Sequence, residues 1–468
     1  MKSRIAATLV ILLTVILAVL AQCRRSEARP ENPEEKEARK YFAEYLRIDT
    51  SNPPGNETLG AEYLRSILEK DGIPSRLVGS DPKRQSLWAR LSSGSKEPAL
   101  LLLHHIDVVP ANASLWSVPP FSGQRSGGYF WGRGALDIKS LGIAELMAFL
   151  DLKRSGVKLT RDVIFLAVAD EEAGGKLGTR ELLEQHPELF ENVGYVINEG
   201  GANETVVDKI TFWGIEVDEK VPLWLTLVSR GEAAHGAIPP DNGGSIVKLV
   251  AALDAVEKMP RPYRLTPTVS RYLTAVSSTK LGRKRELLEH PEQHFGSPEF
   301  ERIVGPGYRS LLHDTVAFTR LAAGESPNSV PAEASATLDL RLLPDSSPDE
   351  MIQQIQSAVG PDIKVKPVLT EKPVPPSPVD TPLFHILQEQ LEKSEPKSVV
   401  GPLVSPGTSD SRFFRARGIV AYGLSPFKVN YYDADTVHGV DERIRERFFD
   451  QGVGLTRRVV RAFCTETP

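Results

Sequence analysis

Short apolar runs and amphipathic segments alternate along the N-terminal half of the chain. Apolar residues recur with helical spacing over the segments 37–46, 59–71 and 140–154. Nearly continuous apolar runs occupy the segments 98–109, 161–170 and 193–198. The leucines at 100–103 leave no polar face, which is typical of a strand that is covered on both sides. This alternation predicts an α/β domain with a mixed, mostly parallel sheet and helices on both faces.

The pattern changes near residue 219 and returns to the first pattern after residue 371. Partly alternating strands are expected at 221–231, 314–324, 334–344 and 363–368, with helices at 245–258 and 348–359. This βαββαβ order predicts a small α+β domain with an antiparallel sheet, inserted over 219–371. The charged segment 279–300 is expected to be a helical excursion or a flexible loop. A helix at 382–395 and a strand at 418–424 then follow, so 36–218 and 372–468 form two parts of one larger domain.

The first thirty residues predict a segment that is separate from the folded body. Two basic residues precede an apolar run from Ile5 to Ala21, which is typical of a signal peptide or an N-terminal membrane anchor over 1–30. The tetrapeptide ending at Cys23 is similar to a lipoprotein box, although Gln22 stands where a small residue is usual. Cleaved secretion, lipid attachment and an uncleaved anchor stay open, and each predicts an exported protein, either secreted, periplasmic or membrane-anchored. The polar segment 29–37 is expected to be a linker.

Length and composition restrict the function classes. A chain of 468 residues exceeds the size of most single domains. Its net charge of -5 provides no basic surface for nucleic acid, so a small molecule or peptide is the expected substrate. With only 2 cysteines, the chain holds neither a disulfide framework nor a cysteine-ligated zinc cluster.

Histidines and carboxylates follow several of the apolar runs or lie in glycine-rich turns. The candidates are His105, Asp107, Asp137, Glu171, Glu172, Glu199 and His438. Imidazole and carboxylate are ligands of Zn²⁺, and a pair of zinc ions needs a carboxylate that bridges them. Each residue alone is a weak signal, because acidic pairs usually lie on solvated faces and a lone histidine is usually structural.

Taken together and in this order, the motifs resemble those of the zinc-dependent M20 peptidases, a family that includes aminoacylases and carboxypeptidase S. The motifs that carry the resemblance are HIDVVP, WSVPPFSG, GRGALDIKS, ADEEAGG, NEGG, SPNSVP, DLRLLP, GTSDSRFF and HGVDE. The resemblance implies that 36–218 and 372–468 form the catalytic domain. It implies that the inserted domain over 219–371 is a lid that also mediates dimerisation.

The resemblance also implies a role for each candidate residue. The cofactors would be two Zn²⁺ per chain, with Co²⁺ or Mn²⁺ as alternatives. The implied metal ligands are His105 and Glu199 on one ion, Glu172 and His438 on the other, and Asp137 as the bridge. Glu171 would be the general base, which takes a proton from water and returns it to the leaving amine. His235 would stabilise the oxyanion, commonly from the partner of a dimer, while Asn328, Arg341 and Gly407 would hold the substrate's carboxylate.

These roles imply a two-zinc amidohydrolase that releases an amino acid with a free carboxylate from a peptide or an N-acyl amino acid. The segments WSVPPFSG and LWARL most resemble the carboxypeptidase S and N-acyl-amino-acid hydrolase branch, which favours hydrophobic acyl groups or residues. The alternative hypothesis is an exported, membrane-tethered binding module with the same fold and no turnover.

The segment HHIDVVP can be interpreted from strand geometry. Side chains alternate along a strand, so His104 and His105 point to opposite faces, while His105 and Asp107 share one. Asp107 is therefore expected to orient the ligating imidazole or to support the metal site, a catalytic role without direct ligation. His104 is expected to pack into the fold without binding metal.

Overall fold

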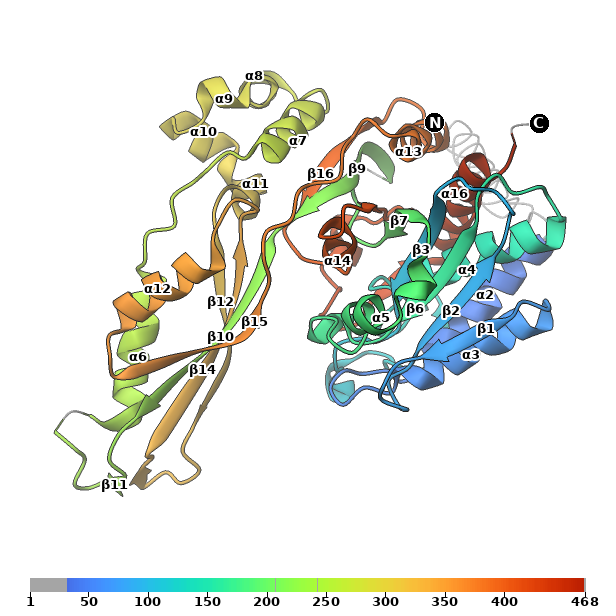
Figure 1. The fold of residues 1–468 in the computed structure, drawn as a ribbon. Helices are drawn as coiled ribbons and strands as arrows, with labels where there is room; N and C mark the ends of the chain where they lie inside the picture. The colour runs from blue at the N-terminus through green and yellow to red at the C-terminus, as the bar shows by residue number, and fades with distance from the viewer. Residues whose placement is uncertain (1–31, 207, 242, 467–468) are drawn as a thin grey trace, which may run out of the picture.

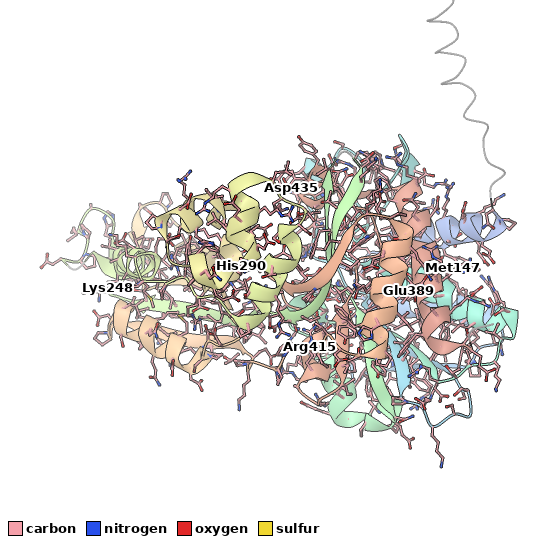
Figure 2. The ribbon with its side chains drawn as sticks, turned by 90° about the horizontal axis from the view of Figure 1, so that it is seen from above. Met147, Lys248, His290, Glu389, Arg415 and Asp435 are labelled. Atoms are coloured by element: carbon pink, nitrogen blue, oxygen red, sulfur yellow. The ribbon has the colours of Figure 1, made fainter. Side chains whose placement is uncertain are left out.

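The computed structural model describes residues 32–206, 208–241 and 243–466, and these residues form two bodies of different size. Figure 1 shows a larger body around a long sheet, with a smaller lid that projects from it. In the view from above, Lys248 lies at the lid end, and Met147 and Glu389 lie on the larger body (Figure 2). None of the described helices combines the length and the hydropathy that crossing a membrane requires. The predicted signal or anchor segment over 1–30 lies outside the described residues.

A mixed sheet runs through the larger body, as predicted. Its strands are β1 (Ser75–Val78), β2 (Ser86–Leu91), β3 (Ala99–His105), β6 (Val163–Val168), β7 (Val193–Asn198), β8 (Ala202–Val206), β9 (Lys209–Glu219), β16 (Val399–Ser405) and β17 (Val420–Gly423). Their order is β1-β2-β6-β3-β7-β17-β9-β16, and β8 pairs with β9. The central strands β6, β3, β7 and β17 are parallel, whereas β1, β2, β6 and β8, β9 pair antiparallel toward the edges. A second, three-stranded sheet consists of β4 (Gln124–Ser126), β5 (Tyr129–Trp131) and β18 (Arg443–Arg445).

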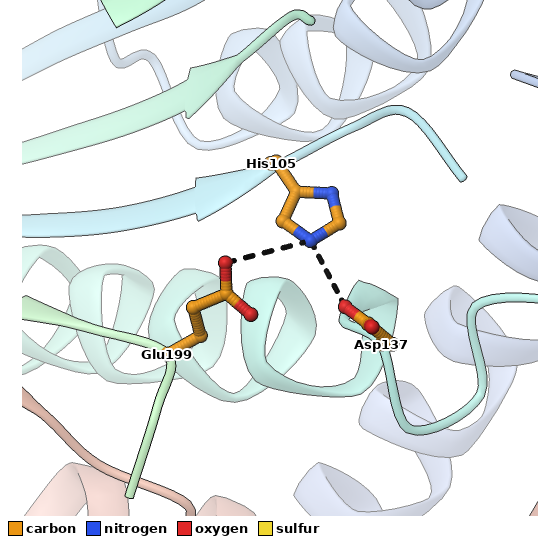
Figure 3. Close-up of side chains that lie close together, drawn as sticks. All are labelled: His105, Asp137 and Glu199. Atoms are coloured by element: carbon orange, nitrogen blue, oxygen red, sulfur yellow. Dashed lines mark hydrogen bonds and ion pairs between the residues drawn. The ribbon is translucent and has the colours of Figure 1, made fainter. Parts of the chain in front are cut away.

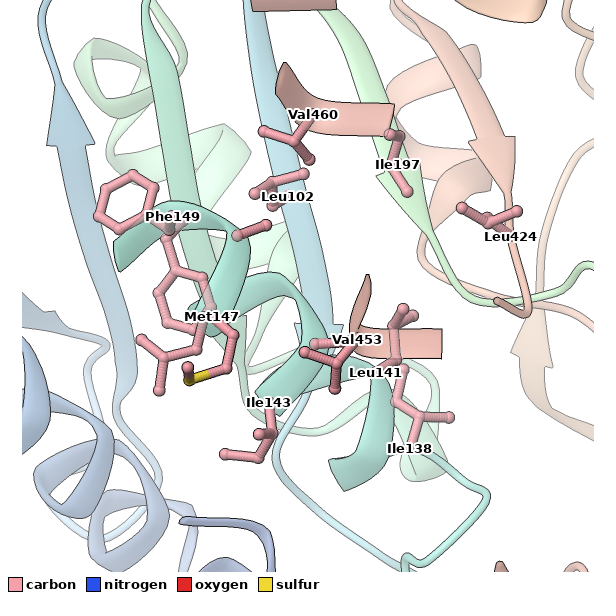
Figure 4. Close-up of a cluster of buried hydrophobic side chains, with 14 of the residues drawn as sticks. Leu102, Ile138, Leu141, Ile143, Met147, Phe149, Ile197, Leu424, Val453 and Val460 are labelled. Carbon is pink, nitrogen blue, oxygen red and sulfur yellow. The ribbon is translucent and has the colours of Figure 1, made fainter. Parts of the chain in front are cut away.

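The leucines of β3 divide the larger body into two apolar layers. Leu100 and Leu102 belong to one buried cluster, and Leu101 and Leu103 belong to the other. The first cluster is covered by α2 (Pro33–Leu46), α3 (Glu57–Lys70), α4 (Lys139–Ser155), α13 (Pro382–Ser394) and α16 (Glu446–Cys464). The second is covered by α5 (Thr179–Gln185) and α14 (Ser411–Arg415). Figure 4 shows side chains of α4 and α16 packed around Leu102 in the first cluster.

The lid contains a four-stranded antiparallel sheet with the predicted βαββαβ order. Its strands are β10 (Val221–Arg230), β12 (Thr315–Ala323), β14 (Glu333–Leu342) and β15 (Ile363–Thr370), and α6 (Gly244–Glu257) and α12 (Pro348–Val359) pack on it. Every second residue of β14 is buried, because one face of this sheet meets the helices and the other meets solvent. At the lid's far end, β11 (Ala234–His235) pairs with β13 (Ser329–Val330).

The charged segment within the lid interval is helical and packs on the larger body. The segment 279–300 contains α8 (Gly282–Glu289), α9 (Pro291–His294) and the start of α10 (Pro298–Ile303), and it is flanked by α7 (Pro267–Ser277) and α11 (Gly305–Leu312). Their apolar side chains form a cluster with Phe212 of β9 and Leu403 of β16 (Figure 1). The helical alternative of the prediction is therefore correct. The flexible-loop alternative is wrong, because the buried leucines and aromatic rings are spread over five short helices.

The helix α2 begins earlier than the sequence pattern predicted. Asn32 caps it by accepting a hydrogen bond from the backbone N–H of Glu34, and Pro33 takes the first helical position. The segment expected to be a linker is therefore helical from Pro33 onward, and the pair Glu34–Arg457 ties its first turn to α16.

Candidate functional site

The predicted ligand residues meet where the central strands end. His105 is the last residue of β3, and Glu199 directly follows β7. Glu172 lies in a short 3₁₀ turn, Glu171–Ala173, that follows β6. Asp137 directly precedes the Ile138 cap of α4, and His438 follows the short helix α15 (Tyr431–Ala434). Bound molecules and ions commonly lie at such strand ends, because the polar residues that follow parallel strands meet at one edge of a sheet.

These residues form two triads that share Asp137. His105 Nε2 lies 3.0 Å from Asp137 Oδ1 and 3.7 Å from Glu199 Oε1 (Figure 3). On the other side, His438 Nε2 lies 3.1 Å from Asp137 Oδ2 and 3.3 Å from Glu172 Oε2. Each oxygen of Asp137 thus faces a different imidazole, which is the arrangement that a carboxylate bridging two cations requires.

The electrostatics of the two triads favour bound positive charge. Burial raises the pKa of Glu199 well above its usual value, and burial together with the charge of Asp137 raises the pKa of Glu172. Burial lowers the pKa of His105, but Glu199 and the other nearby carboxylates raise it well above its usual value. Hydrogen bonds to Asp137 and Glu172 raise the pKa of His438 to about 10. A bound cation would therefore stabilise the ionised form of these carboxylates, because burial penalises negative charge that has no partner.

The donor atoms fit divalent metal ions. His105 Nδ1–H donates to the backbone oxygen of Asp107 at 2.8 Å, so Nε2 is the ring nitrogen that faces the two carboxylates and that would bind a metal ion in place of its proton. The Oε1 atom of Glu172 is buried and has no hydrogen-bond partner. Nitrogen and carboxylate oxygen donors of this kind suit Zn²⁺ and also Co²⁺ or Mn²⁺. The residues present thus match two metal ions held by His105, Asp137, Glu172, Glu199 and His438.

The carboxylate of Asp107 holds the turn that carries Glu171 and Glu172. It is fully buried and accepts hydrogen bonds from the backbone N–H groups of Glu171 and Glu172, both at 3.2 Å. Asn52 donates a third hydrogen bond to it at 2.8 Å. The nearest approach of the carboxylate to His105 Nδ1 is 3.6 Å, so the imidazole is oriented by the backbone oxygen of Asp107. Asp107 therefore contacts both the turn of the two glutamates, through its carboxylate, and the imidazole of His105, through its backbone oxygen.

Sequence reasoning missed a buried glutamate that holds the Asp137 loop. Glu442 accepts hydrogen bonds from the backbone N–H groups of Leu136 and Asp137, at 2.7 and 3.1 Å, and pairs with Arg133 at 2.7 Å. It lies in the HGVDE motif with His438, so one short segment contributes a ligand and also fixes the bridging loop. The HGVDE motif includes Glu442, but no pattern in the sequence indicated that Glu442 binds the backbone of the Asp137 loop.

A cavity of about 230 Å³ opens over the triads. Glu171 lines it, and burial raises the pKa of this carboxyl well above its usual value. Arg412, which sequence reasoning also missed, places Nη1 3.9 Å from Glu171 Oε1. Arg341 and Gly407 line the cavity, as the resemblance implied for a carboxylate site. Asp339 orients the Arg341 guanidinium through two hydrogen bonds of 2.8 and 3.0 Å.

His235 and Asn328 lie together at the far end of the lid, on β11 and directly before β13, and neither lines the cavity. Both are exposed, and Figure 1 shows β11 at the tip farthest from the larger body. Within one chain, Asn328 therefore does not share a site with Arg341, contrary to the sequence-based expectation. Arg341 lies near the end of β14 and Asn328 precedes β13, so the length of β14 separates the two residues.

The other histidine of HHIDVVP lies on the opposite face of β3. His104 is fully buried among Gly142, Phe165 and Tyr45, and its Nδ1 lies 3.2 Å from Glu145 Oε2. Burial lowers the pKa of His104 to about 3, so the ring is neutral. These contacts belong to the apolar layer under α4 and not to either triad.

Replacing His104 with alanine is therefore expected to destabilise the fold and to leave the metal site intact. Removing the ring leaves a cavity in the core and lowers the free energy of unfolding by about 3 kcal/mol. The matched variant His105→Ala is expected to lose bound metal. Chemical denaturation and metal analysis of both variants check this, and loss of metal from His104→Ala would contradict the assignment.

Comparisons with known proteins agree with this geometry. The sequence profile of peptidase family M20/M25/M40 matches residues 101–462. N-fatty-acyl-amino acid synthase/hydrolase from Xenopus tropicalis is 31% identical over 355 residues, which are 74% of this chain and 68% of that protein. Aminoacylase-1 from Homo sapiens is 26% identical over 435 residues, 91% of this chain and 94% of that protein. The fold is similar to the M20 family metallo-carboxypeptidase Sso-CP2 from Sulfolobus solfataricus, with a TM-score of 0.73, 20% identity, and coverage of 92% of this chain and 99% of that one.

Proposed function

Since the chain belongs to peptidase family M20/M25/M40 and is a hydrolase of the peptidase and aminoacylase type, we propose that it is a two-zinc amidohydrolase. Its reaction releases an amino acid with a free carboxylate from an N-acyl amino acid or a peptide. The observation that carries the proposal is the pair of triads that share Asp137 beneath the cavity lined by Glu171 and Arg341. A relative of similar fold from Bacillus subtilis is described as a dinuclear metal binding peptidase, which supports two ions.

Glu171 is the general base of the proposed reaction. When bound, the two metal ions polarise the scissile carbonyl and make water more acidic. Glu171 takes the proton from the attacking water and passes it to the nitrogen of the leaving amine, so the amide bond breaks without a free amide anion. Burial makes the carboxylate of Glu171 more basic, and cations held by the two triads would favour its deprotonated form, in which it can take the proton of water. The backbone hydrogen bonds to Asp107 keep Glu171 beside Glu172, the ligand.

Arg341 is the proposed anchor for the substrate's carboxylate. Its guanidinium lies at the cavity, where Asp339 holds it in one orientation and Trp224 donates a further hydrogen bond to Asp339 at 3.1 Å. A planar, fixed guanidinium can bind a carboxylate through two parallel hydrogen bonds. Gly407 also lines this cavity, and we assign its loop to the same carboxylate site.

Two of the implied substrate-contacting residues, His235 and Asn328, lie outside the cavity of their own chain. We assign His235 and Asn328 to the site of a partner chain, because both lie at the exposed lid tip and outside their own chain's cavity. There His235 would donate to the oxyanion, and Asn328 would bind the substrate's carboxylate. We also propose that the protein is exported, on the basis of the apolar N-terminal run. The alternative of a binding module without turnover is not supported, since the matched relatives are hydrolases by name.

A substrate panel tests the proposed function. The full chain is incubated with Zn²⁺ and a set of N-acyl amino acids and dipeptides, and the release of free amino acid is measured. We expect release that a chelator abolishes and that added Zn²⁺ restores, with a fall in Tm on chelation because metal binding stabilises the folded state. Binding of the panel compounds without release, at full metal content, would contradict the proposal.

A further inference from the structure

Arg412 is a buried arginine in the wall of the cavity over the triads, and it is neither a metal ligand nor the proposed base. It belongs to α14, and only 5% of its surface is exposed. A guanidinium ion is costly to bury unless its N–H groups and its charge find partners in the protein. The partners of Arg412 therefore indicate what this side chain does at the cavity.

The guanidinium of Arg412 joins two loops that are distant in the sequence. Its Nη2 donates to the backbone oxygen of Gly174 at 3.0 Å, and Gly174 directly follows the turn that begins at Glu171. Its Nη1 donates to the backbone oxygen of Ser409 at 2.5 Å. Ser409 lies two residues after Gly407, in the loop assigned to the substrate's carboxylate. One side chain thus links the turn of the base to the loop of the carboxylate site.

The positive charge of Arg412 also faces the side chain of Glu171. Nη1 of Arg412 lies 3.9 Å from Glu171 Oε1 and 4.0 Å from Asp410 Oδ1. Both distances are too long for a hydrogen bond, so the guanidinium attracts these carboxylates through charge alone. This attraction adds to the hydrogen bond at Gly174. Arg412 therefore contacts the turn of the base through its backbone and through its carboxylate.

The two linked loops are irregular where Arg412 binds them. Gly174 has a φ of 101°, in the left-handed region that glycine adopts without strain, and Gly407 lies between β16 and α14. On the other side of its loop, Ser409 donates its backbone N–H and its hydroxyl to Glu219 Oε2, at 2.7 and 3.0 Å. Backbone without a helical or sheet ladder depends on such side-chain contacts for its position. Arg412 supplies one of them to each loop.

We propose that Arg412 is a positioning residue that sets the spacing between Glu171 and the carboxylate site, and this inference rests on the proposed function. A substrate whose carboxylate is bound by Arg341 and the Gly407 loop presents its amide at a fixed distance from that loop. The base must therefore stand at a matching distance. Because Arg412 binds the backbone of both loops, it holds that distance constant.

Arg412→Lys is expected to lower kcat about a hundredfold, with about two zinc ions still bound per chain. Lysine keeps the charge but lacks the planar fork that reaches two backbone oxygens. Arg161→Lys is the matched control. Arg161 also donates to two backbone oxygens, of Phe463 at 3.0 Å and Pro98 at 2.9 Å, and it does not line the cavity. It should lose stability and keep kcat, and equal kcat losses in both variants would overturn the inference.

A double-mutant cycle shows whether Arg412 acts through Glu171. Glu171→Gln protein lacks the base, so adding Arg412→Lys should lower its residual kcat about twofold or less. The same substitution should lower kcat about a hundredfold when Glu171 is present. A merely structural role would give the same loss in both backgrounds, and that result would overturn the inference.

Backbone hydrogen exchange separates this inference from the proposed function. The zinc-loaded Arg412→Lys and Arg161→Lys proteins are compared with the unmodified protein in the absence of substrate. We expect exchange to rise about tenfold over 171–175 and 406–410 in Arg412→Lys alone, because both segments lose a contact. This rise without turnover in the unmodified protein would retain the link between the loops and contradict the proposed function. Turnover in the unmodified protein with unchanged exchange in Arg412→Lys would overturn the inference alone, and absence of both would overturn both.

Discussion

Replacing Glu171 with glutamine is expected to lower kcat by about a thousandfold while the bound zinc stays at about two ions per chain. Glutamine keeps the size of the side chain but cannot accept the proton of water. Glu171 belongs to neither triad, so the ligands of both ions remain in place. Steady-state kinetics and metal analysis of the same preparation measure the two quantities.

The adjacent Glu172 provides the matched control for this experiment. Both glutamates lie in one turn, and both donate a backbone N–H to Asp107. Only Glu172 belongs to a triad, with Asp137 and His438. Glu172→Gln should therefore lose bound metal as well as turnover. Retained turnover in Glu171→Gln, or equal metal loss in both variants, would contradict the division of roles between the two residues.

Replacing Asp137 with alanine is expected to remove both metal ions, because each oxygen of this carboxylate faces a different triad. Bound metal should fall below one ion per chain, and turnover should fall to the level of chelated protein. The thermal stabilisation by added Zn²⁺ should also vanish, a loss of about 4 kcal/mol for each ion at a metal concentration a thousand times its dissociation constant. Metal analysis and thermal denaturation with and without Zn²⁺ check these outcomes.

Asp349→Ala is a suitable control, since it removes a carboxylate from an exposed position at the start of α12 in the lid. It should retain metal, turnover and the shift in Tm. Replacing a ligand of one triad alone, as in His438→Ala, should leave the other triad complete. If Asp137→Ala retained one tightly bound ion, the bridging role of Asp137 would be wrong.

Local patterns along the chain were sufficient for the fold class and for most of the side chains that the fold brings together in the two triads. Alternation along β3 predicted that His104 and His105 face opposite layers, because a strand has a period of two whatever surrounds it. The βαββαβ order of the lid followed from the spacing of apolar residues for the same reason. The ligand residues themselves were identified by ordered motifs that resemble those of the M20 peptidases.

Contacts between distant segments were decided only by the tertiary structure. Glu442 accepts a hydrogen bond from the backbone N–H of Asp137, and Asp107 accepts one from the backbone N–H of Glu171. Both N–H groups need a protein acceptor because packing removes them from water. The five short helices over 267–312 pack on the sheet of the larger body, although the chain places them within the lid interval. Sequence alone therefore determined the periodic elements and the chemical nature of the ligands. The tertiary structure decided which backbone groups Asp107 and Glu442 bind, and it separated Asn328 from Arg341, because burial and long-range hydrogen bonds have no local period.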